Sequence, residues 1–217
     1  MTIEFLHIIS VYYDTNPEFL KYLECPYILF YKEHSEKEPY NNKNIGGAET
    51  NILKYIKTHY HNLPDICVFT HPFNIKWTHN GNLYDCINEL FKTRKKLDNF
   101  GPICNYPPRL DVFGNQSVKY NFMKKTGWWD DTMRPYFGEL PENAFLNKLS
   151  TGQFYVRKQT IHRLPLQFYE NMYNWLMTKS IPNTLHINSQ DNVFYEFWTT
   201  RFMEWSWEYI FTANLKY

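Results

Sequence analysis

The order of elements in residues 44–73 constrains the fold of this chain more than any other stretch of its sequence. A glycine-opened turn is followed by a helix, predicted over about Glu49–Tyr60, in which apolar residues recur at helical spacing. A Leu-Pro-Asp stop then leads into a short apolar strand, Ile66–Thr70. Ligands of open α/β sheets bind beyond the carboxyl ends of the strands, so Thr70 and His71 are predicted to lie at a binding site.

Two further strands are predicted before this helix. Phe5–Tyr13 and Tyr27–Tyr31 are rich in β-branched and aromatic residues, a short helix over Pro17–Leu23 separates them, and a charged loop over Glu33–Asn44 follows. The alternation of strands and helices implies crossover connections and a largely parallel sheet. The carboxyl ends of such strands share one edge, where we expect Tyr12, Asp14, Glu33, Thr70 and His71.

The rest of the chain alternates less regularly. We predict a helix over Leu83–Leu97, a strand over Gly152–Arg157, a helix around Pro165–Thr178 and an aromatic helix over Ser189–Phe211. Residues 100–147 read as a long loop rich in Pro, Gly and Trp, and such a loop in a compact domain is usually a lid or a binding loop. Because no linker or repeat divides the chain, we expect a single domain over residues 1–217.

Composition limits the partners that the chain can take. Its 217 residues include 23 basic and 22 acidic side chains, a balance that argues against nucleic acid as a partner. The 18 Tyr, 17 Phe and 7 Trp either form an aromatic core or provide faces on which sugar rings or bases stack. No apolar run approaches the roughly 18 residues of a membrane-spanning helix, so no membrane span is expected.

The four cysteines, Cys25, Cys67, Cys86 and Cys104, are widely spaced and form no C-x-x-C pair. Cys67 lies within the apolar run of a predicted strand, a common place for a buried free thiol. Because the sequence shows no signal peptide, we expect free thiols, no disulfide framework and a cytoplasmic location.

Several landmarks together resemble one protein family. They are the NIG at Asn44, YIKTHYHNLPD and CVFTHPF in the first half, and GQFYVRKQTIHRLPLQFYENMYNWL and FMEWSWEYIF in the second. Their order resembles a domain-of-unknown-function family of predicted glycosyltransferases with the GT-A, or nucleotide-diphospho-sugar transferase, fold. The resemblance implies a mostly parallel central sheet flanked by helices, with a nucleotide-sugar half over about 1–98 and an acceptor half over about 99–217.

The resemblance also implies an activity and a set of site residues. A hexose or pentose would move from a nucleotide-diphosphate donor to a glycan or protein-linked acceptor. The donor would contact the strand-edge residues Tyr12, Asp14, Glu33, Thr70 and His71, with Arg157 at the diphosphate. A divalent cation, Mn²⁺ or Mg²⁺, would be held by His71 and Asp130. The acceptor would contact Trp128, Trp129, Gln153 and Trp205.

Two acidic residues are candidates for the general base of such a transfer. Asp131 follows two tryptophans and Asp130, and Glu204 lies in a helix that is aromatic on nearly every side. Burial raises the pKa of a carboxyl group toward the range useful for a general base unless the group is paired. The alternatives are a polar loop with buried indoles around Asp131 and a structural ion pair between Arg201 and Glu204.

The strand-edge residues have structural alternatives as well. His71 would then only cap its strand, Asp14 would form an Asx-turn, and Gln153–Arg157 would be a strand with a solvated basic end. The chain has Gly47-Ala48-Glu49 where the family carries an Arg-Glu pair. It also contains no Asp-x-Asp, the divalent-metal signature of most GT-A enzymes.

These departures leave a second hypothesis open, which is a non-catalytic carbohydrate-binding domain that retains the transferase fold. A single-strand nucleic-acid binder that uses the aromatic residues is a third hypothesis. The nearly neutral net charge of +1 disfavours it, because neutralising phosphates takes an excess of Lys and Arg.

Overall fold

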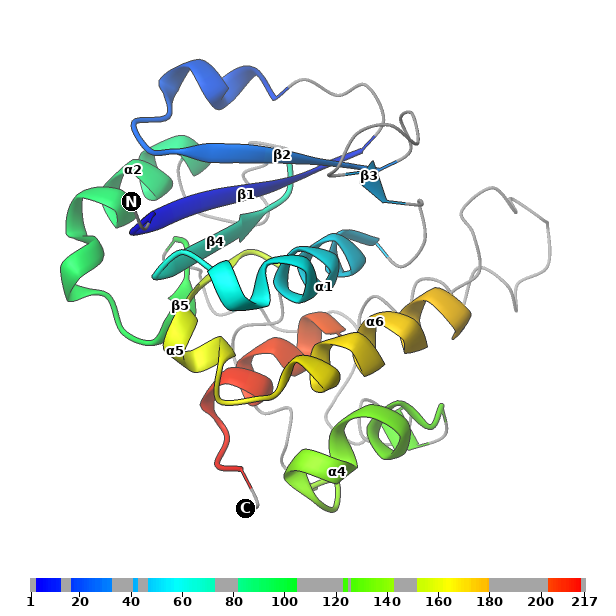
Figure 1. Cartoon of the computed structure of the whole chain (residues 1–217). Coiled ribbons are helices and arrows are strands. Elements are labelled where there is room, and N and C mark those ends of the chain that lie inside the picture. Colours follow the sequence, from blue (N-terminus) through cyan, green and yellow to red (C-terminus); the bar gives the residue numbers. More distant parts are fainter. Residues whose placement is uncertain are drawn as a thin grey trace.

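The computed structural model describes residues 3–12, 17–32, 41–42, 47–72, 82–104, 123–124, 126–142, 152–179 and 203–215. The described strands form one mixed sheet with the order β3-β2-β1-β4-β6-β5 (Figure 1). They are β1 Phe5–Tyr12, β2 Tyr27–Lys32, β3 Asn41–Asn42, β4 Ile66–Thr70, β5 Phe100–Pro102 and β6 Phe154–Arg157. The pairs β3–β2, β2–β1 and β1–β4 are parallel, whereas β6 runs antiparallel to both β4 and β5.

The described helices include those predicted, in the predicted order, together with η4, α4 and α5, which were not predicted. They are η1 Glu18–Tyr22, α1 Gly47–His59 continued by η2 Tyr60–Asn62, α2 Leu83–Thr93 continued by η3 Arg94–Lys96, the π-helix η4 Trp129–Met133, α4 Arg134–Phe137, α5 Lys158–Ile161, α6 Leu166–Lys179 and a C-terminal helix over 203–212. The prediction of an α/β fold with helices flanking the sheet is confirmed.

Alternation along the strands divides the core between the two faces of the sheet. Successive side chains of a strand point to opposite faces. In β1, Leu6 and Ile8 join the cluster formed with α1 and α6, whereas Phe5, Ile9 and Val11 join the cluster formed with η1 and α2. Figure 1 shows α1 and α6 on one side of the sheet and α2 on the other, so helices cover both faces.

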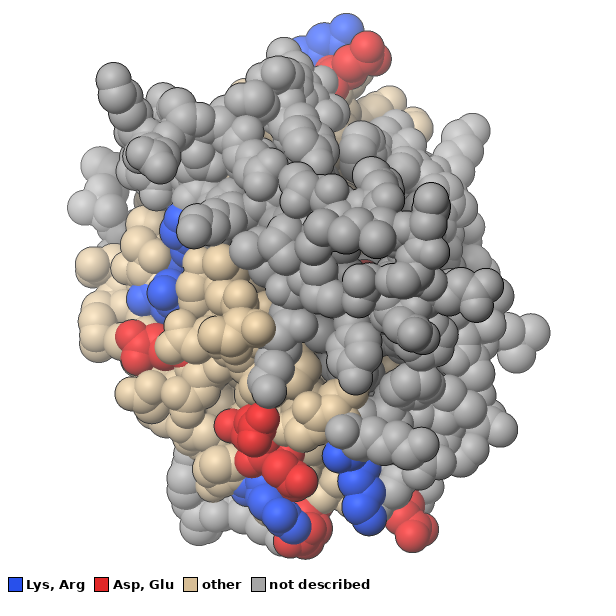
Figure 2. All heavy atoms as spheres, turned by 90° about the vertical axis from the view of Figure 1, so that its right-hand side faces the viewer, with Lys and Arg blue, Asp and Glu red and all other residues tan. Residues whose placement is uncertain are grey.

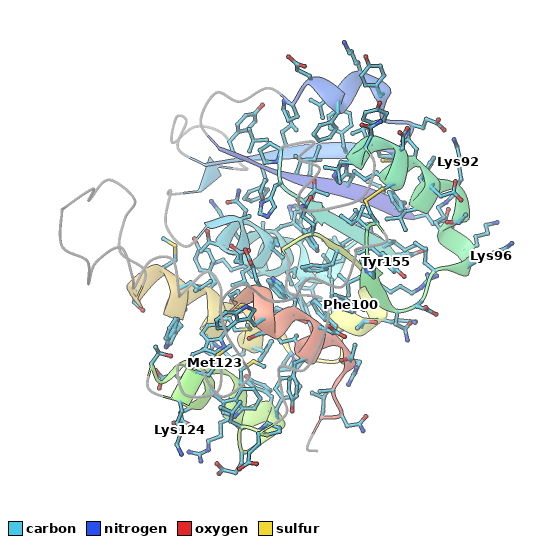
Figure 3. The ribbon with its side chains drawn as sticks, turned by 180° about the vertical axis from the view of Figure 1, so that it is seen from behind. Lys92, Lys96, Phe100, Met123, Lys124 and Tyr155 are labelled. Atoms are coloured by element: carbon cyan, nitrogen blue, oxygen red, sulfur yellow. A yellow bond between two sulfur atoms is a disulfide. The ribbon has the colours of Figure 1, made fainter. Side chains whose placement is uncertain are left out.

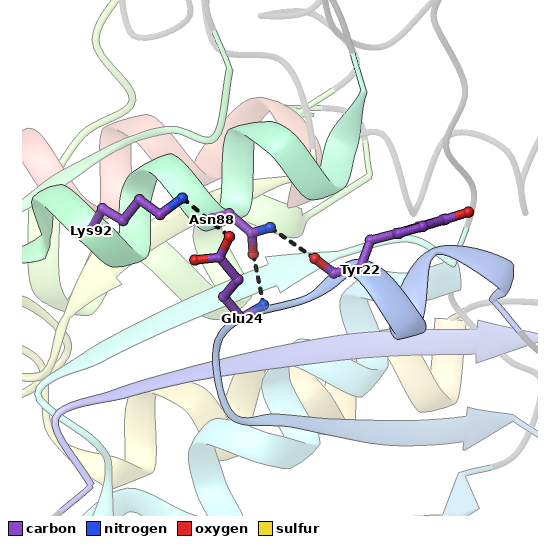
Figure 4. Close-up of polar contacts among 4 residues, drawn as sticks. All are labelled: Tyr22, Glu24, Asn88 and Lys92. Atoms are coloured by element: carbon purple, nitrogen blue, oxygen red, sulfur yellow. Dashed lines mark hydrogen bonds and ion pairs between the residues drawn. The ribbon is translucent and has the colours of Figure 1, made fainter.

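Side-chain hydrogen bonds tie α2 to the chain before β2. Asn88 is buried, its amide nitrogen donates to the carbonyl of Tyr22 at 2.8 Å, and its carbonyl oxygen accepts from the backbone of Glu24 at 2.9 Å (Figure 4). The exposed Lys92 pairs with the Glu24 carboxylate at 3.1 Å. Seen from behind, Lys92 and Lys96 project outward from the end of this helix (Figure 3).

An aromatic layer lies beyond α1. Helix α6 packs against α1 and contacts the π-helix on its other side. Trp128, Trp129 and Trp207 are almost fully buried there, and the Trp207 and Phe211 rings stack with centroids 5.6 Å apart. The interpretation of the aromatic residues as core is confirmed for these side chains.

Other predictions differ in detail from the structure. The expected loop over 100–147 contains β5, the π-helix and α4, and the expected loop over Glu33–Asn44 contains β3. None of these short elements contains a run of four consecutive apolar residues between turn signals, which is the pattern that predicted the five-residue strand Ile66–Thr70. The remaining parts of both loops, and residues 189–202 of the predicted last helix, fall largely or wholly outside the described residues.

The prediction that the chain has no disulfide is wrong. Cys86 in α2 is bonded to Cys104, which follows β5, and their α-carbons lie 5.5 Å apart (Figure 3). The pair was missed because its spacing of 18 residues matches no signature, and because β5, which brings Cys104 to α2, was read as loop. Cys25 and Cys67 are free as predicted, and Cys67 is buried as predicted. Cys25 is buried as well, and burial raises the pKa of both thiols.

The helices in the part of the chain that the structure describes include none that is long and apolar enough to cross a bilayer.

Candidate functional site

The order of the strands creates a switch point between β1 and β4. The chain moves outward from β1 to β2 and β3 in one direction, and α1 then returns it to β4 on the other side of β1. Between β1 and β2, helix η1 packs on the face covered by α2, whereas α1 covers the opposite face (Figure 1). In open α/β sheets the ligand crevice forms beyond the carboxyl ends of the strands at such a reversal.

Predicted site residues lie at this carboxyl edge. Tyr12 ends β1, Thr70 ends β4, and His71 follows directly. Asp14 and Glu33, which follow β1 and β2 in the sequence, lie outside the described residues. Figure 2 views the molecule from the side toward which the parallel strands run, and the described charged residues visible there mix both signs.

The antiparallel strand β6 brings a second pair of residues to the same edge. Phe69 of β4 pairs with Phe154 of β6. Continuing this register by two residues sets Thr70 opposite Gln153 and His71 opposite Gly152. The start of β6 therefore meets the end of β4, and Gln153 joins the predicted donor residues. Its side chain is buried.

Glu49 and His71 converge over Gly152. A β-carbon built on Gly152 would lie 2.7 Å from Glu49 Oε1 and 3.5 Å from His71 Nε2. Any side chain at residue 152 would collide with the Glu49 carboxylate, so glycine allows this close approach. Glu49 is only 1% exposed and lies in the first turn of α1, where the helix dipole favours a negative charge.

Two hydrogen bonds hold the first turns of α1 in place. The Asn51 amide donates to the carbonyl of Phe30 in β2 at 2.9 Å, and the Thr50 hydroxyl donates to the carbonyl of Gly47 at 3.1 Å. Gly47 has a φ of 62°, a left-handed conformation that favours glycine. These contacts fix the position from which Glu49 reaches Gly152.

A buried histidine supports the end of β4 from the other face. His7 of β1 is completely buried, and its Nε2 lies 2.8 Å from the Thr70 hydroxyl. Burial lowers the pKa of His7 from 6.5 to about 3, so its ring is neutral at physiological pH. The pair positions Thr70 without adding charge to the edge.

Sequence reasoning did not propose Glu49, Gly152 or His7 as site residues. The available signal for Glu49 was a carboxylate directly after a double glycine at the start of a helix. Gly152 gave a weaker signal, a glycine at the start of a predicted strand, where close approach of other groups is common. His7 sits in an apolar run and carries no signal of its own.

Arg157, predicted to contact the diphosphate, lies at the opposite edge of the sheet. It pairs with Ile66 at the start of β4, and its guanidinium donates to the carbonyls of Leu97 at 2.8 Å and Arg94 at 3.1 Å. The antiparallel course of β6 carries it away from His71, so the structure does not bring these two predicted donor-site residues together.

The tryptophans predicted to bind the acceptor are buried. Trp128 donates to the Ser206 hydroxyl at 3.3 Å, Trp129 donates to the carbonyl of Gly138 at 2.7 Å, and Trp205 is 4% exposed. A sugar ring stacks on an open aromatic face, which these indoles do not offer. The alternative stated for residues around Asp131 is confirmed in that Trp128 and Trp129 are buried, although the segment is a π-helix and not a loop.

The acidic candidates lie in two places. Asp130 and Asp131 belong to the π-helix, which Figure 1 shows on the far side of α6 from the sheet. Asp130 pairs with Arg134 at 3.4 Å, and Asp131 accepts a hydrogen bond from the Trp175 indole at 3.1 Å. Glu204 is half-buried near the start of the C-terminal helix.

The predicted metal ligands do not meet. His71 lies at the sheet edge and Asp130 beyond α6, and the described residues contain no group of three or more His, Cys, Asp or Glu side chains arranged to hold a metal. Glu49 and His71 are two donors of suitable chemistry, which is fewer than a protein metal site uses.

Comparisons with known proteins add a family. The model of the family described as "Protein of unknown function (DUF3431)" matches residues 102–217, more than half of the chain. The match includes Gly152 and Gln153, whereas Glu49 and His71 precede it. A search of the curated proteins finds no match.

Proposed function

The chain belongs to the DUF3431 family, whose description names no activity, and we propose that it is a glycosyltransferase acting on a nucleotide-diphosphate sugar. The observation that supports this proposal is the convergence of Glu49 and His71 over Gly152 at the switch point of the sheet. Nucleotides bind at such switch points in other doubly wound sheets. The resemblance to GT-A transferases supports the same reading.

In this proposal the nucleotide lies along the carboxyl ends of β1, β2 and β4. Tyr12 and Thr70 end two of these strands, and Asp14 and Glu33 follow them in the sequence. The diphosphate then lies close to His71. A carboxylate beside an imidazole favours its protonated form, so Glu49 would help His71 to carry the positive charge that balances a leaving diphosphate.

Glu204 is our candidate for the base that deprotonates the acceptor hydroxyl. The C-terminal helix begins on the side of the molecule toward which the parallel strands run, and Glu204 is its second residue (Figure 1). Asp131 is less suited, because the π-helix that carries it lies on the far side of α6 from the sheet. A divalent cation stays a prediction, with Glu49 and His71 as two of the donors that it would need.

The disulfide bears on where this activity takes place. Disulfides persist in oxidising compartments and are rare in the cytosol, so the Cys86–Cys104 bond supports an oxidising compartment in place of the cytoplasm expected from the sequence.

A thermal-shift screen tests the proposal. The purified protein is heated with UDP, GDP, ADP and CDP, each with and without Mn²⁺. We expect one nucleotide to raise the melting temperature, and we expect His71→Ala to remove this rise while His162→Ala, at an exposed histidine, keeps it. The absence of a shift with every nucleotide would contradict the proposal.

A non-catalytic carbohydrate-binding domain is the second candidate function. The missing Asp-x-Asp and the lack of a three-ligand metal group among the described residues favour it. The two functions separate in an assay for slow hydrolysis of UDP-glucose, GDP-mannose and related sugar nucleotides. A transferase releases nucleotide from one of them, whereas a binding domain releases none.

A further inference from the structure

A concave region lies at the edge of the sheet opposite His71 and Gly152. A pocket of about 490 Å³ opens between the amino-terminal ends of β1 and β2, the end of α1 and the start of α5. Leu6 and Ile28 come from the two strands, and Tyr55 and His59 come from α1. The volume falls within the roughly 300–1,000 Å³ of small-molecule sites. The edge lies on the left of Figure 1, where β1 and β2 begin.

The polar lining of this pocket is cationic or neutral. Lys158, His59, His61 and Asn62 supply it, and no described carboxylate lines the pocket. Lys158 is half-buried, and its ammonium group forms no ion pair with any described residue. Glu4, an acid close in sequence to the pocket, is engaged by Arg94 at 2.9 Å.

Among the described residues that line the pocket, Lys158 therefore provides the permanent positive charge. Burial lowers the pKa of His59, which favours its neutral form. A half-buried ammonium group with no counter-ion attracts an anion, because the surrounding protein screens its charge less than water does.

The walls of the pocket favour a flat apolar body. The half-buried His59 ring, which packs on the buried Tyr55 ring with centroids 4.7 Å apart, provides an aromatic wall, and the half-buried Ile28 side chain provides an aliphatic one. An aromatic ring meets both kinds of wall favourably. A ligand that combines one anionic group with one aromatic ring satisfies the charge and the walls together.

We propose that this pocket binds a small aromatic carboxylate, with its carboxylate at Lys158 and its ring against the half-buried His59 and Ile28 side chains. The site is separate from the proposed glycosyltransferase site, because the two lie at opposite edges of the sheet.

Titration with benzoate tests the proposal, and benzamide serves as an uncharged ligand of the same shape. Calorimetry on the full chain should show benzoate binding at least about tenfold tighter than benzamide, since a single charge-assisted contact corresponds to about that ratio. Lys158→Met should remove this preference, whereas Lys95→Met, at an exposed lysine of η3, should keep it. Equal binding of the two ligands, or no binding of benzoate at 10 mM (roughly the weak limit for a fragment), would overturn the proposal.

Chemical-shift mapping of the unmodified protein keeps the test independent of the variant's folding. Benzoate should shift the backbone amides of residues 59–63 and of Lys158, and leave those of Gly152 and Gln153 unchanged. Shifts confined to any other region would overturn the assignment of the site.

Discussion

The two edges of the sheet differ in how they arrange polar groups. At the carboxyl edge a buried carboxylate and an imidazole meet over a glycine with no room for a β-carbon. At the amino edge Lys158 and two histidines line an open pocket of about 490 Å³. Strand β6 connects the edges, because its start places Gly152 and Gln153 at one and its end places Arg157 and Lys158 at the other. The direction of one short strand therefore decides which side chains can cooperate.

Substitutions at the two edges should differ most in their effect on the turnover of a sugar nucleotide. We expect His71→Ala and Glu49→Gln each to lower the turnover of the sugar nucleotide by roughly 100-fold, as for the loss of one group that stabilises charge in a transition state. Lys158→Met, at the other edge, should leave turnover unchanged. Steady-state rates of nucleotide release measure the effect. Equal decreases of turnover in all three variants would contradict the claim that catalysis depends on the carboxyl edge alone.

We expect the folded protein to lose stability at low pH because of His7, which contacts Thr70 at the carboxyl edge. The folded-state pKa of His7, about 3, lies below its value of 6.5 in the unfolded chain, so the unfolded chain binds more protons between these pH values. The stability that His7 contributes is therefore fully present above pH 6.5 and falls as the pH drops toward 3. By pH 4, protonation of His7 in the unfolded chain lowers the free energy of unfolding by about 3 kcal/mol.

Urea unfolding of the wild type and His7→Gln between pH 7 and pH 4 measures this loss. The variant should show a flatter dependence of unfolding free energy on pH, whatever its stability at pH 7. His61→Gln, at an exposed histidine of the amino edge, is the matched control and should keep the wild-type slope. An unchanged slope in His7→Gln would argue against a neutral buried His7.

Gly152→Ala tests the close approach itself. The new methyl group would meet Glu49 Oε1 at 2.7 Å, so the carboxylate or the strand must move. We expect a loss of about 1–3 kcal/mol in unfolding free energy, typical of overpacking, together with weaker nucleotide binding. Asn174→Ala, at an exposed position of α6, should cost under about 0.5 kcal/mol. A variant as stable as the wild type would mean that Glu49 does not press on Gly152.

Arg157→Met should affect stability alone. It removes the hydrogen bonds to the carbonyls of Leu97 and Arg94, which we expect to cost about 1–2 kcal/mol of unfolding free energy. Nucleotide binding, measured by the same thermal-shift rise as for the wild type, should be retained. If the variant folds but its melting temperature no longer rises with the nucleotide, Arg157 belongs to the donor site. The functional contrast between the two edges would then be weaker.

The sequence predicted the parallel half of the sheet well and the site less well. Ile66–Thr70 is a strand with the predicted bounds because four consecutive apolar residues, Ile66–Phe69, between turn signals are a strong local pattern. The direction of β6 depends on which strand it pairs with, and no local pattern reports that choice. Arg157 was for this reason grouped with His71, whereas Gly152 is the residue that meets it.

Two other predictions were wrong for the same reason, because they depend on contacts between residues that are distant in the sequence. The Cys86–Cys104 disulfide depends on β5, whose three residues are too few for a recognisable period. Trp128 and Trp129 were assigned to the acceptor because they precede two acids, but packing against α6 and the C-terminal helix buries them. Composition alone does not decide whether an indole is core or surface.

The central claim is that nucleotide diphosphates bind at the carboxyl edge, beside Glu49, His71 and Gly152. The most direct measurement is chemical-shift mapping of the labelled protein with UDP, GDP, ADP and CDP in the presence of Mn²⁺. The account predicts that one nucleotide shifts the amides of Thr70, His71 and Gly152 and spares those of residues 59–63. Shifts at the amino edge, or no shifts with any of the four nucleotides, would contradict it.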